Sequence, residues 1–262
     1  MPNDVSLFLD SIAKTYNAGS VHEKALFKDF TLKIRKGDFV SVVGSNGSGK
    51  TSMLNLICGS LSIDAGRIFL LDRRIDSMPE FQRSRYIGRV FQDPAKGTCA
   101  ALTILENMSL ANNKGKRFNL TRGVNKQQID FYRTALETLE LGLENALNQK
   151  VGSLSGGQRQ ALALLIATMT PIELLILDEH TAALDPKSSE TVMQLTQKIV
   201  HEKKLTTLMV THNLKYAIEY GNRLIMMHQG GIVLDAADEE KAAHSVDDLL
   251  KVFTAISVEL GN

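Results

Sequence analysis

The segment that most limits how this chain can fold is GSNGSGKT, residues 44–51, which fits the pattern GxxxxGK(S/T). It follows a short β-branched run, FVSVVG (39–44), and leads into KTSMLNLICGSL, whose apolar spacing is helical. Between a strand and a helix, such glycines turn backbone N–H groups inward around phosphate oxygens. The positive end of the helix favours the same anion. We therefore predict a phosphate-binding turn in which Lys50 reaches the outer phosphates and Thr51 offers its hydroxyl to Mg²⁺.

A second informative stretch is LLILDEHTAALD, residues 174–185, where an apolar run ends in two adjacent acids. A phosphate-binding turn of this kind needs an acid from across the sheet to hold Mg²⁺. Asp178 ends a strand at the carboxyl edge, where ligands bind in such sheets. Neighbouring side chains on an extended chain point in different directions, so we expect Asp178 to face the metal and Glu179 the attacking water. The alternative is that both acids only cap the next helix.

Hydrophobic periodicity divides the rest of the chain into strand-like and helix-like stretches. The first 40 residues alternate with period two around Asn, Gly and Lys-Gly breaks, which favours antiparallel strands. Residues 93–153 are polar, with amphipathic helices expected at TILENMSLANN and KQQIDFYRTALETLELGL and a basic, flexible loop between them. After residue 158 helices and strands alternate again, up to a hairpin turning at Gly230-Gly231 and one or two short final helices. The pattern indicates one α/β domain with a helical insertion.

Composition excludes some classes of function. Lys plus Arg is 30 and Asp plus Glu is 29, so the net charge of +1 gives no general reason to expect nucleic-acid binding. The start, MPNDVSLFLD, lacks the features of a secretory signal, and the longest apolar stretches are too short to span a bilayer. Cys58 and Cys99 form no metal-binding pattern, and we expect both to be small buried hydrophobes in a reducing cytosol.

The pentapeptide LSGGQ, residues 154–158, lies just before a long predicted helix. Its small residues and free N–H groups suit an anion at the positive helix end, although a flexible loop that caps a helix looks the same. With GSNGSGKT before it and LLILDEHTAALD after it, LSGGQ closely resembles the ATP-binding-cassette (ABC) ATPases. The resemblance covers nearly the whole chain, and further motifs of that family follow in the expected order.

The resemblance implies a role for several single residues. Tyr16 matches the aromatic residue that stacks on adenine, and Gln92, in RVFQDP, matches the glutamine that links the nucleotide site to the helical insertion. The AALD loop, residues 182–185, matches a loop that touches the opposite subunit, and His212 matches the histidine that contacts the γ-phosphate. Taken singly, the tyrosine, glutamine and histidine have plainer alternatives as a half-buried ring, a surface amide and a core imidazole.

The family's binding and catalytic roles fall on a defined set of positions. Catalysis is expected from Lys50, Glu179 and His212, and Mg²⁺ binding from Thr51, Gln92 and Asp178. ATP binding is expected from Tyr16, Gly44, Ser45, Asn46, Gly47, Ser48, Gly49, Lys50, Thr51, Ser52, Gln92, Ser155, Gly156, Gly157 and Gln158.

The resemblance also implies an architecture: a P-loop NTPase core with a mixed sheet, an N-terminal antiparallel β subdomain and an inserted α-helical subdomain. Residues 1–92 and 158–236 would form the core with the β subdomain, 93–157 the helical subdomain, and 237–262 a short helical tail. Two such cassettes, in a homodimer or heterodimer, close head to tail in the ATP-bound state. Each ATP then lies between one P-loop and the partner's LSGGQ.

By this resemblance the chain is an ATPase that powers a transporter whose permease subunits are separate chains. We expect a bacterial importer of a small solute, an amino acid or similar nutrient, that works with a substrate-binding protein. The cassette would be cytoplasmic and peripheral on the inner face of the membrane, without a nucleic-acid partner. The alternatives are a soluble mechanoenzyme that acts on nucleic acid or ribosomes, and the ATPase of an efflux or lipoprotein-release complex.

The chain departs from the family pattern at three places. His180 stands where proline is usual, and we expect a tolerated turn residue, the alternative being a group that assists proton transfer. Ala182 replaces a common serine and removes one hydroxyl from the subunit interface. Thr51-Ser52 reverses the commoner order, but both hydroxyls remain.

Overall fold

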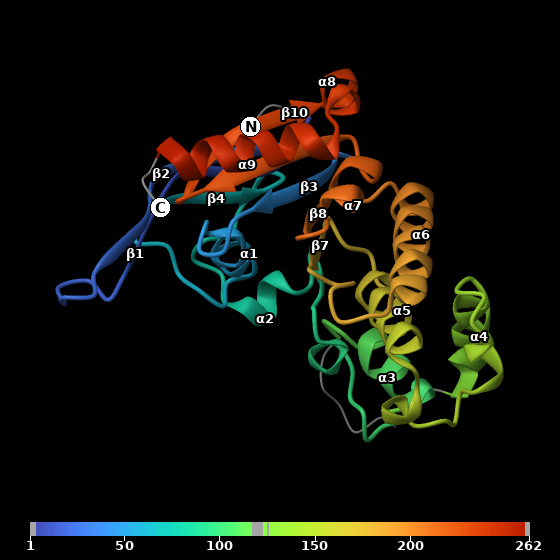
Figure 1. The fold of residues 1–262 in the computed structure, drawn as a ribbon. Coiled ribbons are helices and arrows are strands. Elements are labelled where there is room, and N and C mark those ends of the chain that lie inside the picture. Colours follow the sequence, from blue (N-terminus) through green and yellow to red (C-terminus); the bar gives the residue numbers. More distant parts are fainter. Residues whose placement is uncertain (1–3, 117–122, 125, 260–262) are drawn as a thin grey trace.

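Two sheets form the framework of the computed structural model, which describes residues 4–116, 123–124 and 126–259 (Figure 1). The four-stranded sheet has the order β2-β1-β4-β5 and is antiparallel throughout. Its strands are β1 (Val5–Tyr16), β2 (Lys24–Arg35), β4 (Ala65–Leu70) and β5 (Arg73–Arg74). The antiparallel strands predicted from the period-two pattern of the first 40 residues are thus confirmed as the pair β1 and β2.

The six-stranded sheet has the order β10-β9-β3-β8-β7-β6. All its pairs are parallel except β9 with β10, so the sheet is mixed, as expected. Its strands are β3 (Phe39–Gly44), β6 (Ile87–Val90), β7 (Leu174–Asp178), β8 (Thr207–Val210), β9 (Arg223–His228) and β10 (Gly231–Ala237). The strand β3, which leads into the phosphate-binding turn, therefore lies in the middle of the sheet between strands from the other half of the chain.

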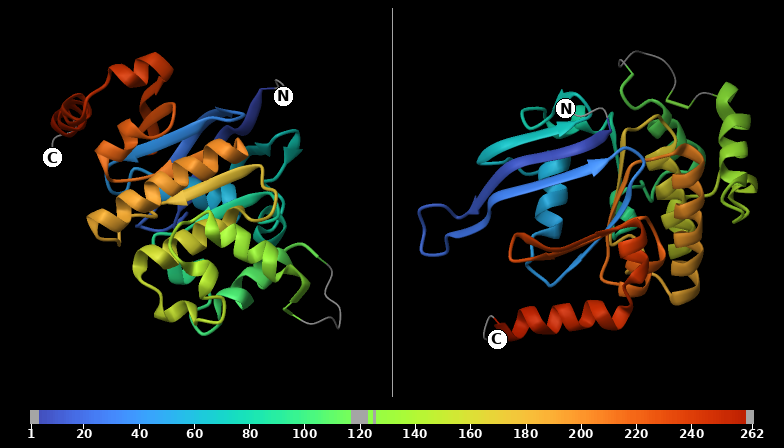
Figure 2. Two further views of the ribbon diagram at one scale, coloured as in Figure 1. Left: turned by 90° about the vertical axis from the view of Figure 1, so that its right-hand side faces the viewer. Right: turned by 90° about the horizontal axis from the view of Figure 1, so that it is seen from above.

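Alternate residues of the central strands bury against different layers. In β7, Leu174 and Ile176 join a core with α1 (Lys50–Cys58) and the antiparallel sheet. Leu175 and Leu177 join a second core, with α5 (Gly156–Thr168) and α6 (Pro186–Lys203), on the opposite face. Because side chains alternate along a strand, one apolar run supplies both cores. Figure 2 shows the resulting layers, with α1 between the two sheets and the long helices beyond the other face.

The helical insertion contains shorter elements than its sequence predicts. The segment KQQIDFYRTALETLELGL was expected to form one helix, but α4 spans only Ile129–Glu137, after a 3₁₀ turn at Lys126–Gln128. The chain leaves the helix because Glu140 and Gly142 take left-handed conformations. The predicted basic, flexible loop falls partly on residues 117–122 and 125, outside the described residues.

The other helices lie close to their predicted positions. The helix after the phosphate-binding turn ends at Gly59, and two helices close the chain. Among the described residues, no helix is both long enough and apolar enough to cross a membrane. The further α-helices are α2 (Glu80–Arg83), α3 (Ile104–Asn112), α5 (Gly156–Thr168), α6 (Pro186–Lys203), α7 (Leu214–Glu219), α8 (Asp238–Ala243) and α9 (Val246–Glu259).

Two smaller predictions are wrong. The hairpin turns at Gln229-Gly230 rather than Gly230-Gly231, because both turn residues take positive φ, 42° and 79°, as a two-residue type I′ turn requires. Cys58 is buried as expected, but Cys99 is exposed. Its backbone N–H and carbonyl are both bonded to the Asn107 side chain, at 2.7 and 3.0 Å, which holds this polar segment at the surface.

Candidate functional site

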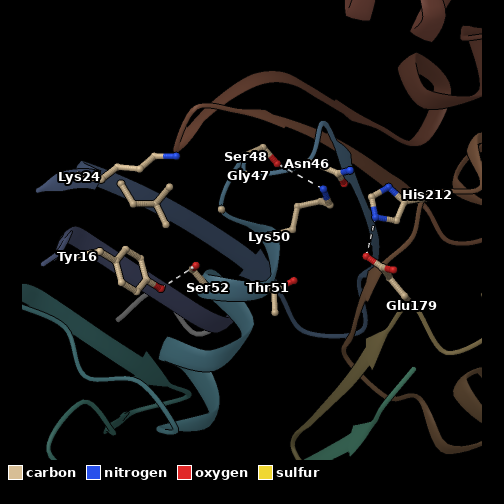
Figure 3. A pocket seen from close by; sticks show the side chains of 12 residues that line it. Tyr16, Lys24, Asn46, Gly47, Ser48, Lys50, Thr51, Ser52, Glu179 and His212 are labelled. Atoms are coloured by element: carbon tan, nitrogen blue, oxygen red, sulfur yellow. Dashed lines mark hydrogen bonds and ion pairs between the residues drawn. The ribbon is translucent and has the colours of Figure 1, made fainter. Parts of the chain in front are cut away.

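A cavity of about 240 Å³ lies where β3 passes into α1 (Figure 3). Small-molecule pockets in proteins are commonly 300–1,000 Å³, so this chain alone encloses only part of a nucleotide. Most of the residues predicted to bind ATP through the phosphate-binding turn line it. The lining residues are Tyr16, Lys24, Leu26, Asn46, Gly47, Ser48, Gly49, Lys50, Thr51, Ser52, Glu179 and His212.

The phosphate-binding turn has a glycine-specific conformation at Gly49, the residue just before α1. Gly49 caps α1 at φ 105°, in the left-handed region. A Cβ atom there would lie 2.9 Å from Cζ of Phe27, closer than real contacts allow. The backbone can therefore pass directly under β2 and start a helix at Lys50. The positive end of that helix faces the cavity, as anion binding requires.

Lys50 is the buried cation of the turn, with only 5% of its surface exposed. Its Nζ donates hydrogen bonds to the carbonyl oxygens of Gly44 (2.7 Å) and Ser45 (3.0 Å). Burial lowers the pKa of the Lys50 ammonium, and the negative charge of Glu179 partly opposes this. A phosphate in the turn would give this ammonium the full negative charge that carbonyl oxygens cannot supply.

The β9–β10 turn supports the phosphate-binding turn from the far end of the chain. The Gly230 N–H donates to the Ser48 carbonyl at 2.9 Å, and His228 Nδ1 lies 3.4 Å from Ser45 Oγ. A Cβ atom on Gly230 would collide with the Leu26 carbonyl. This supporting role was missed from the sequence, where the glycine pair signalled only a hairpin.

The two acids after β7 point to different partners. Asp178 Oδ2 lies 2.7 Å from an Nη atom of Arg89, whereas Glu179 Oε1 lies 2.7 Å from Nε2 of His212. The divergence agrees with the prediction, but its cause does not: Glu179 is not extended and has φ 49°. Its N–H still bonds to the Val210 carbonyl (2.9 Å), so the chain turns just as strand pairing ends.

Tyr16 lies on the opposite side of the turn from Glu179 and His212 (Figure 3). Its hydroxyl is 2.9 Å from Oγ of Ser52, in the first turn of α1. The half-buried ring is thus fixed at the edge of the cavity, where a flat nucleobase can stack on it.

Gln92 is exposed and does not line this cavity. It follows β6, and the chain then passes into a 3₁₀ turn, Pro94–Lys96, that begins the helical insertion. Its expected contact with Mg²⁺ stays a prediction.

The LSGGQ residues lie at the start of α5, also outside the cavity of their own chain. Ser155 Oγ accepts the Gln158 N–H and the Gln158 side chain accepts the Ser155 N–H, which closes a capping box. Added Cβ atoms on Gly156 and Gly157 would lie 3.2 and 3.0 Å from Leu184 and Ser188 side chains. Gly156 therefore lets α5 pack closely on Leu184 of the AALD loop, and Gly157 lets it pack on Ser188 of α6, while Ser155 and Gly156 remain exposed.

His180 is buried and does not line the cavity. Its Nε2 lies 3.2 Å from Oγ1 of Thr196, which itself donates to the Val192 carbonyl at 2.7 Å. Because that hydroxyl proton is engaged, Nε2 must carry the hydrogen of a neutral ring. Burial lowers the pKa of His180 to about 4. The histidine is thus a core residue against α6, and the geometry does not support a role in proton transfer.

Because His180 is buried as a neutral ring, we expect the stability of the folded protein to fall in acid. The unfolded chain takes up a proton near the ordinary pKa of 6.5, whereas the folded chain resists protonation until about pH 4. Its contribution to stability is therefore complete above about pH 6.5 and is lost as the pH falls towards 4. We expect the free energy of unfolding to fall by about 3 kcal/mol over this window through His180 alone.

Urea unfolding at pH 7 and pH 4.5 measures the effect. A His180→Gln protein, which keeps a donor for Thr196, should lose much less stability between the two pH values than the native protein. The matched control is His201→Gln on the exposed end of α6, which should behave like the native protein. Equal acid sensitivity of native and His180→Gln proteins would contradict the prediction.

Thr51 and Asp178 carry hard oxygen ligands of the kind that Mg²⁺ prefers; Thr51 lines the cavity, whereas Asp178 lies outside its lining. Oδ1 of Asp178 has no hydrogen-bond partner within the described part of the chain. Mg²⁺ is usually held by one or two carboxylates together with substrate phosphates. The described residues contain no group of three or more His, Cys, Asp or Glu that could hold a metal ion by itself.

Comparison with known proteins gives one consistent result. A family model described as ABC transporter matches residues 27–182, more than half of the chain. The chain is 44% identical to the tyrosine transport ATP-binding protein of Clostridioides difficile (strain R20291), over 94% of this chain and 98% of that protein. It is 31% identical to a probable branched-chain amino acid transport ATP-binding protein, LivF, of Archaeoglobus fulgidus, over 87% of this chain and 92% of that protein.

A solved structure agrees with these relatives. The dimeric ATP-binding cassette MJ0796, in a post-hydrolysis state with ADP and Pi, is 30% identical, with a TM-score of 0.74 over 88% of this chain and 98% of that one. Sequence family, relatives and fold thus agree with the motifs around the cavity. The chain belongs to the ABC transporter family, as an ATP-binding subunit that hydrolyses ATP.

Proposed function

We propose that this chain powers the import of an amino acid, with tyrosine as the first candidate, through a bacterial ABC transporter. One observation carries the choice of cargo: the 44% identity to a tyrosine transport ATP-binding protein extends over 94% of the chain. The importer role agrees with relatives at lower identity, which include a thiamine import ATP-binding protein of Photorhabdus laumondii at 32%.

The phosphates of ATP would bind in the turn at the start of α1. Lys50 would exchange its two carbonyl partners for the outer phosphates, and the free N–H groups of the turn would bind the remaining oxygens. Tyr16, held by Ser52, would stack on the adenine. Mg²⁺, bound by Thr51 and Asp178 with Gln92 nearby, would neutralise charge on the phosphates.

Glu179 would orient and deprotonate the attacking water. His212 Nε2 engages one of its carboxylate oxygens, which leaves the second oxygen for the water. The left-handed backbone of Glu179 turns this carboxylate away from Asp178, so the two acids serve different steps. His212 would also stabilise the γ-phosphate. Catalysis would then rest mostly on positioning and charge stabilisation, as in phosphoryl transfer generally.

Two cassettes would complete each site. The single-chain cavity is small, and Ser155 and Gly156 face outward from their own site, so each LSGGQ is free to close over the ATP of a second cassette. That second cassette would be another copy of this chain or a related chain. The AALD loop, packed on Gly156 through Leu184, would contact it as well.

The assembly would further contain separate permease subunits and a substrate-binding protein, with the cassette on the inner face of the cell membrane. The helical insertion, entered at Gln92 and including α3, would grip the permease. ATP binding would close the dimer and hydrolysis would open it, which gives the two states that transport needs.

The test is transport by the purified complex in lipid vesicles. The cassette and ATP are on the inside of the vesicles, and the substrate-binding protein is on the outside. We expect ATP-dependent uptake of radiolabelled tyrosine that a Glu179→Gln cassette abolishes. Excess unlabelled leucine and thiamine serve as competitors. Uptake of thiamine but not of tyrosine would contradict the proposed substrate. ATP-driven export of tyrosine would contradict the proposed direction of transport.

A further inference from the structure

Arg89 is a largely buried cation beside the acid that is proposed to hold the metal. Its Nη atom lies 2.7 Å from Asp178 Oδ2, and the two side chains are 12% and 14% exposed. We propose that Arg89 is a positioning residue for Asp178: it holds one carboxylate oxygen so that the other stays directed to Mg²⁺–ATP. The inference rests on the proposed role of Asp178 and assigns a role to a residue outside the family motifs.

Strand register places Arg89 and Asp178 on the same face of the sheet. Arg89 in β6 pairs with Ile176 in β7, and Asp178 follows two residues later on the same side of its strand. Ile176 belongs to the core that packs on α1. Both charged side chains therefore share the face that carries α1, whose first turn contains Thr51.

The ion pair has few competing partners. The nearby Cys58 thiol is neutral, because burial raises its pKa to about 11 despite the opposing charge of Arg89. Arg89 Nε is buried and has no hydrogen-bond partner among the residues that the structure describes. By contrast, the buried Arg83 donates its hydrogen bonds to the main-chain carbonyls of Met78, Leu56, Ile57 and Asp76. Arg83 supports the backbone, whereas the charge of Arg89 is directed to a carboxylate.

The position of the guanidinium is itself fixed from the helical side. Its Cζ lies 4.7 Å from the centre of the Phe91 ring, within the range of a cation–π contact. The Phe91 carbonyl accepts a hydrogen bond from the fully buried Gln160 side chain on α5, at 3.0 Å. A chain of contacts thus runs from α5, which starts with LSGGQ, to Asp178.

Loss of Arg89 has a defined expected consequence. Without it, Asp178 keeps a largely buried negative charge but loses the cation that pairs with it and the contact that fixes its side chain. Residues that orient metal ligands typically contribute 10–100-fold to metal affinity. An Arg89→Met protein should therefore need about ten-fold more Mg²⁺ than the native protein for half-maximal binding of mant-ATP.

The experiment titrates MgCl₂ into the full-length protein with mant-ATP and follows nucleotide fluorescence, so it measures binding and not turnover. Arg89→Lys keeps the charge but not the planar guanidinium, and its midpoint should lie between the native and Arg89→Met values. The matched control is Arg73→Met. Arg73 pairs with Glu173 at 3.0 Å and stacks on Tyr86 at 3.9 Å. These two partners directly precede β7 and β6, at the end of both strands that lies away from Asp178. Loss of Arg73 should therefore leave the Mg²⁺ midpoint unchanged.

Each outcome decides the question. An unchanged midpoint in a folded Arg89→Met protein makes Arg89 a structural residue, and a lower midpoint makes it a competitor of the metal; both overturn the inference. If Arg89→Met does not fold, an Arg89→Lys midpoint equal to the native one overturns it. If the native protein binds mant-ATP without any dependence on Mg²⁺, the proposed metal-binding role of Asp178 is wrong. That result differs from the outcomes above, in which only the role of Arg89 is wrong.

Discussion

A Glu179→Gln protein should bind ATP and form the closed dimer but hydrolyse ATP at least about 100-fold more slowly than the native protein, because a positioned general base contributes 10²–10⁴-fold. The amide matches the carboxylate in shape, so the backbone turn at φ 49° has no new reason to change. The amide oxygen cannot accept the proton of the attacking water. Phosphate release under steady-state conditions measures turnover, and gel filtration with ATP measures dimer formation.

The matched control is Glu173→Gln, just before the same strand. Glu173 also pairs with a cation, Arg73, but at the opposite end of β7. Its substitution should leave hydrolysis close to native. Near-normal hydrolysis by Glu179→Gln would mean that another group activates the water, and simultaneous loss of ATP binding would mean that the substitution had damaged the site as a whole.

Lys50→Met should reduce ATP affinity by at least about 30-fold, since loss of a buried, hydrogen-bonded charge facing an anion costs about 2–5 kcal/mol. Methionine keeps much of the length of the side chain but can neither donate to the Gly44 and Ser45 carbonyls nor meet a phosphate with a positive charge. Titration with mant-ATP at constant Mg²⁺ measures the dissociation constant.

Lys24→Met provides the comparison, because Lys24 lines the same cavity from an exposed position at the start of β2 (Figure 3). An exposed ammonium contributes little, about 1 kcal/mol or less. The change in affinity should therefore be several-fold at most. Equal losses in the two variants would show that general charge, rather than the buried position of Lys50, determines binding. Thermal unfolding of both proteins separates a loss of binding from a loss of fold.

Much of the fold was predictable because its signals are local. The run FVSVVG, the glycines that follow it and the helical spacing from Lys50 specify strand, turn and helix within some 20 residues. LLILD gave both the strand and the acids at its end, because an apolar run that stops at charge marks the edge of a buried sheet. The antiparallel pair at the N-terminus followed from period-two alternation alone.

Features that depend on distant parts of the chain were not predictable in this way. The Gln229-Gly230 turn is displaced by one residue from its expected place, because hairpin register is set by backbone twist and by contact with Leu26. The Arg89–Asp178 pair joins residues on neighbouring parallel strands that are far apart in sequence. His180 carries no sign in the sequence that α6 will cover it with Thr196.

The central place of β3 has a consequence for the order in which the protein acquires its activity during synthesis. Its two neighbours in the sheet, β8 and β9, and the Gly230 N–H that holds the Ser48 carbonyl, all come from the second half of the chain. Translation proceeds at about 5–20 residues per second, so the ribosome makes GSNGSGKT roughly 8–36 seconds before its supports at residues 207–230. A nascent chain thus carries the phosphate-binding sequence well before that sequence can be held in a binding conformation.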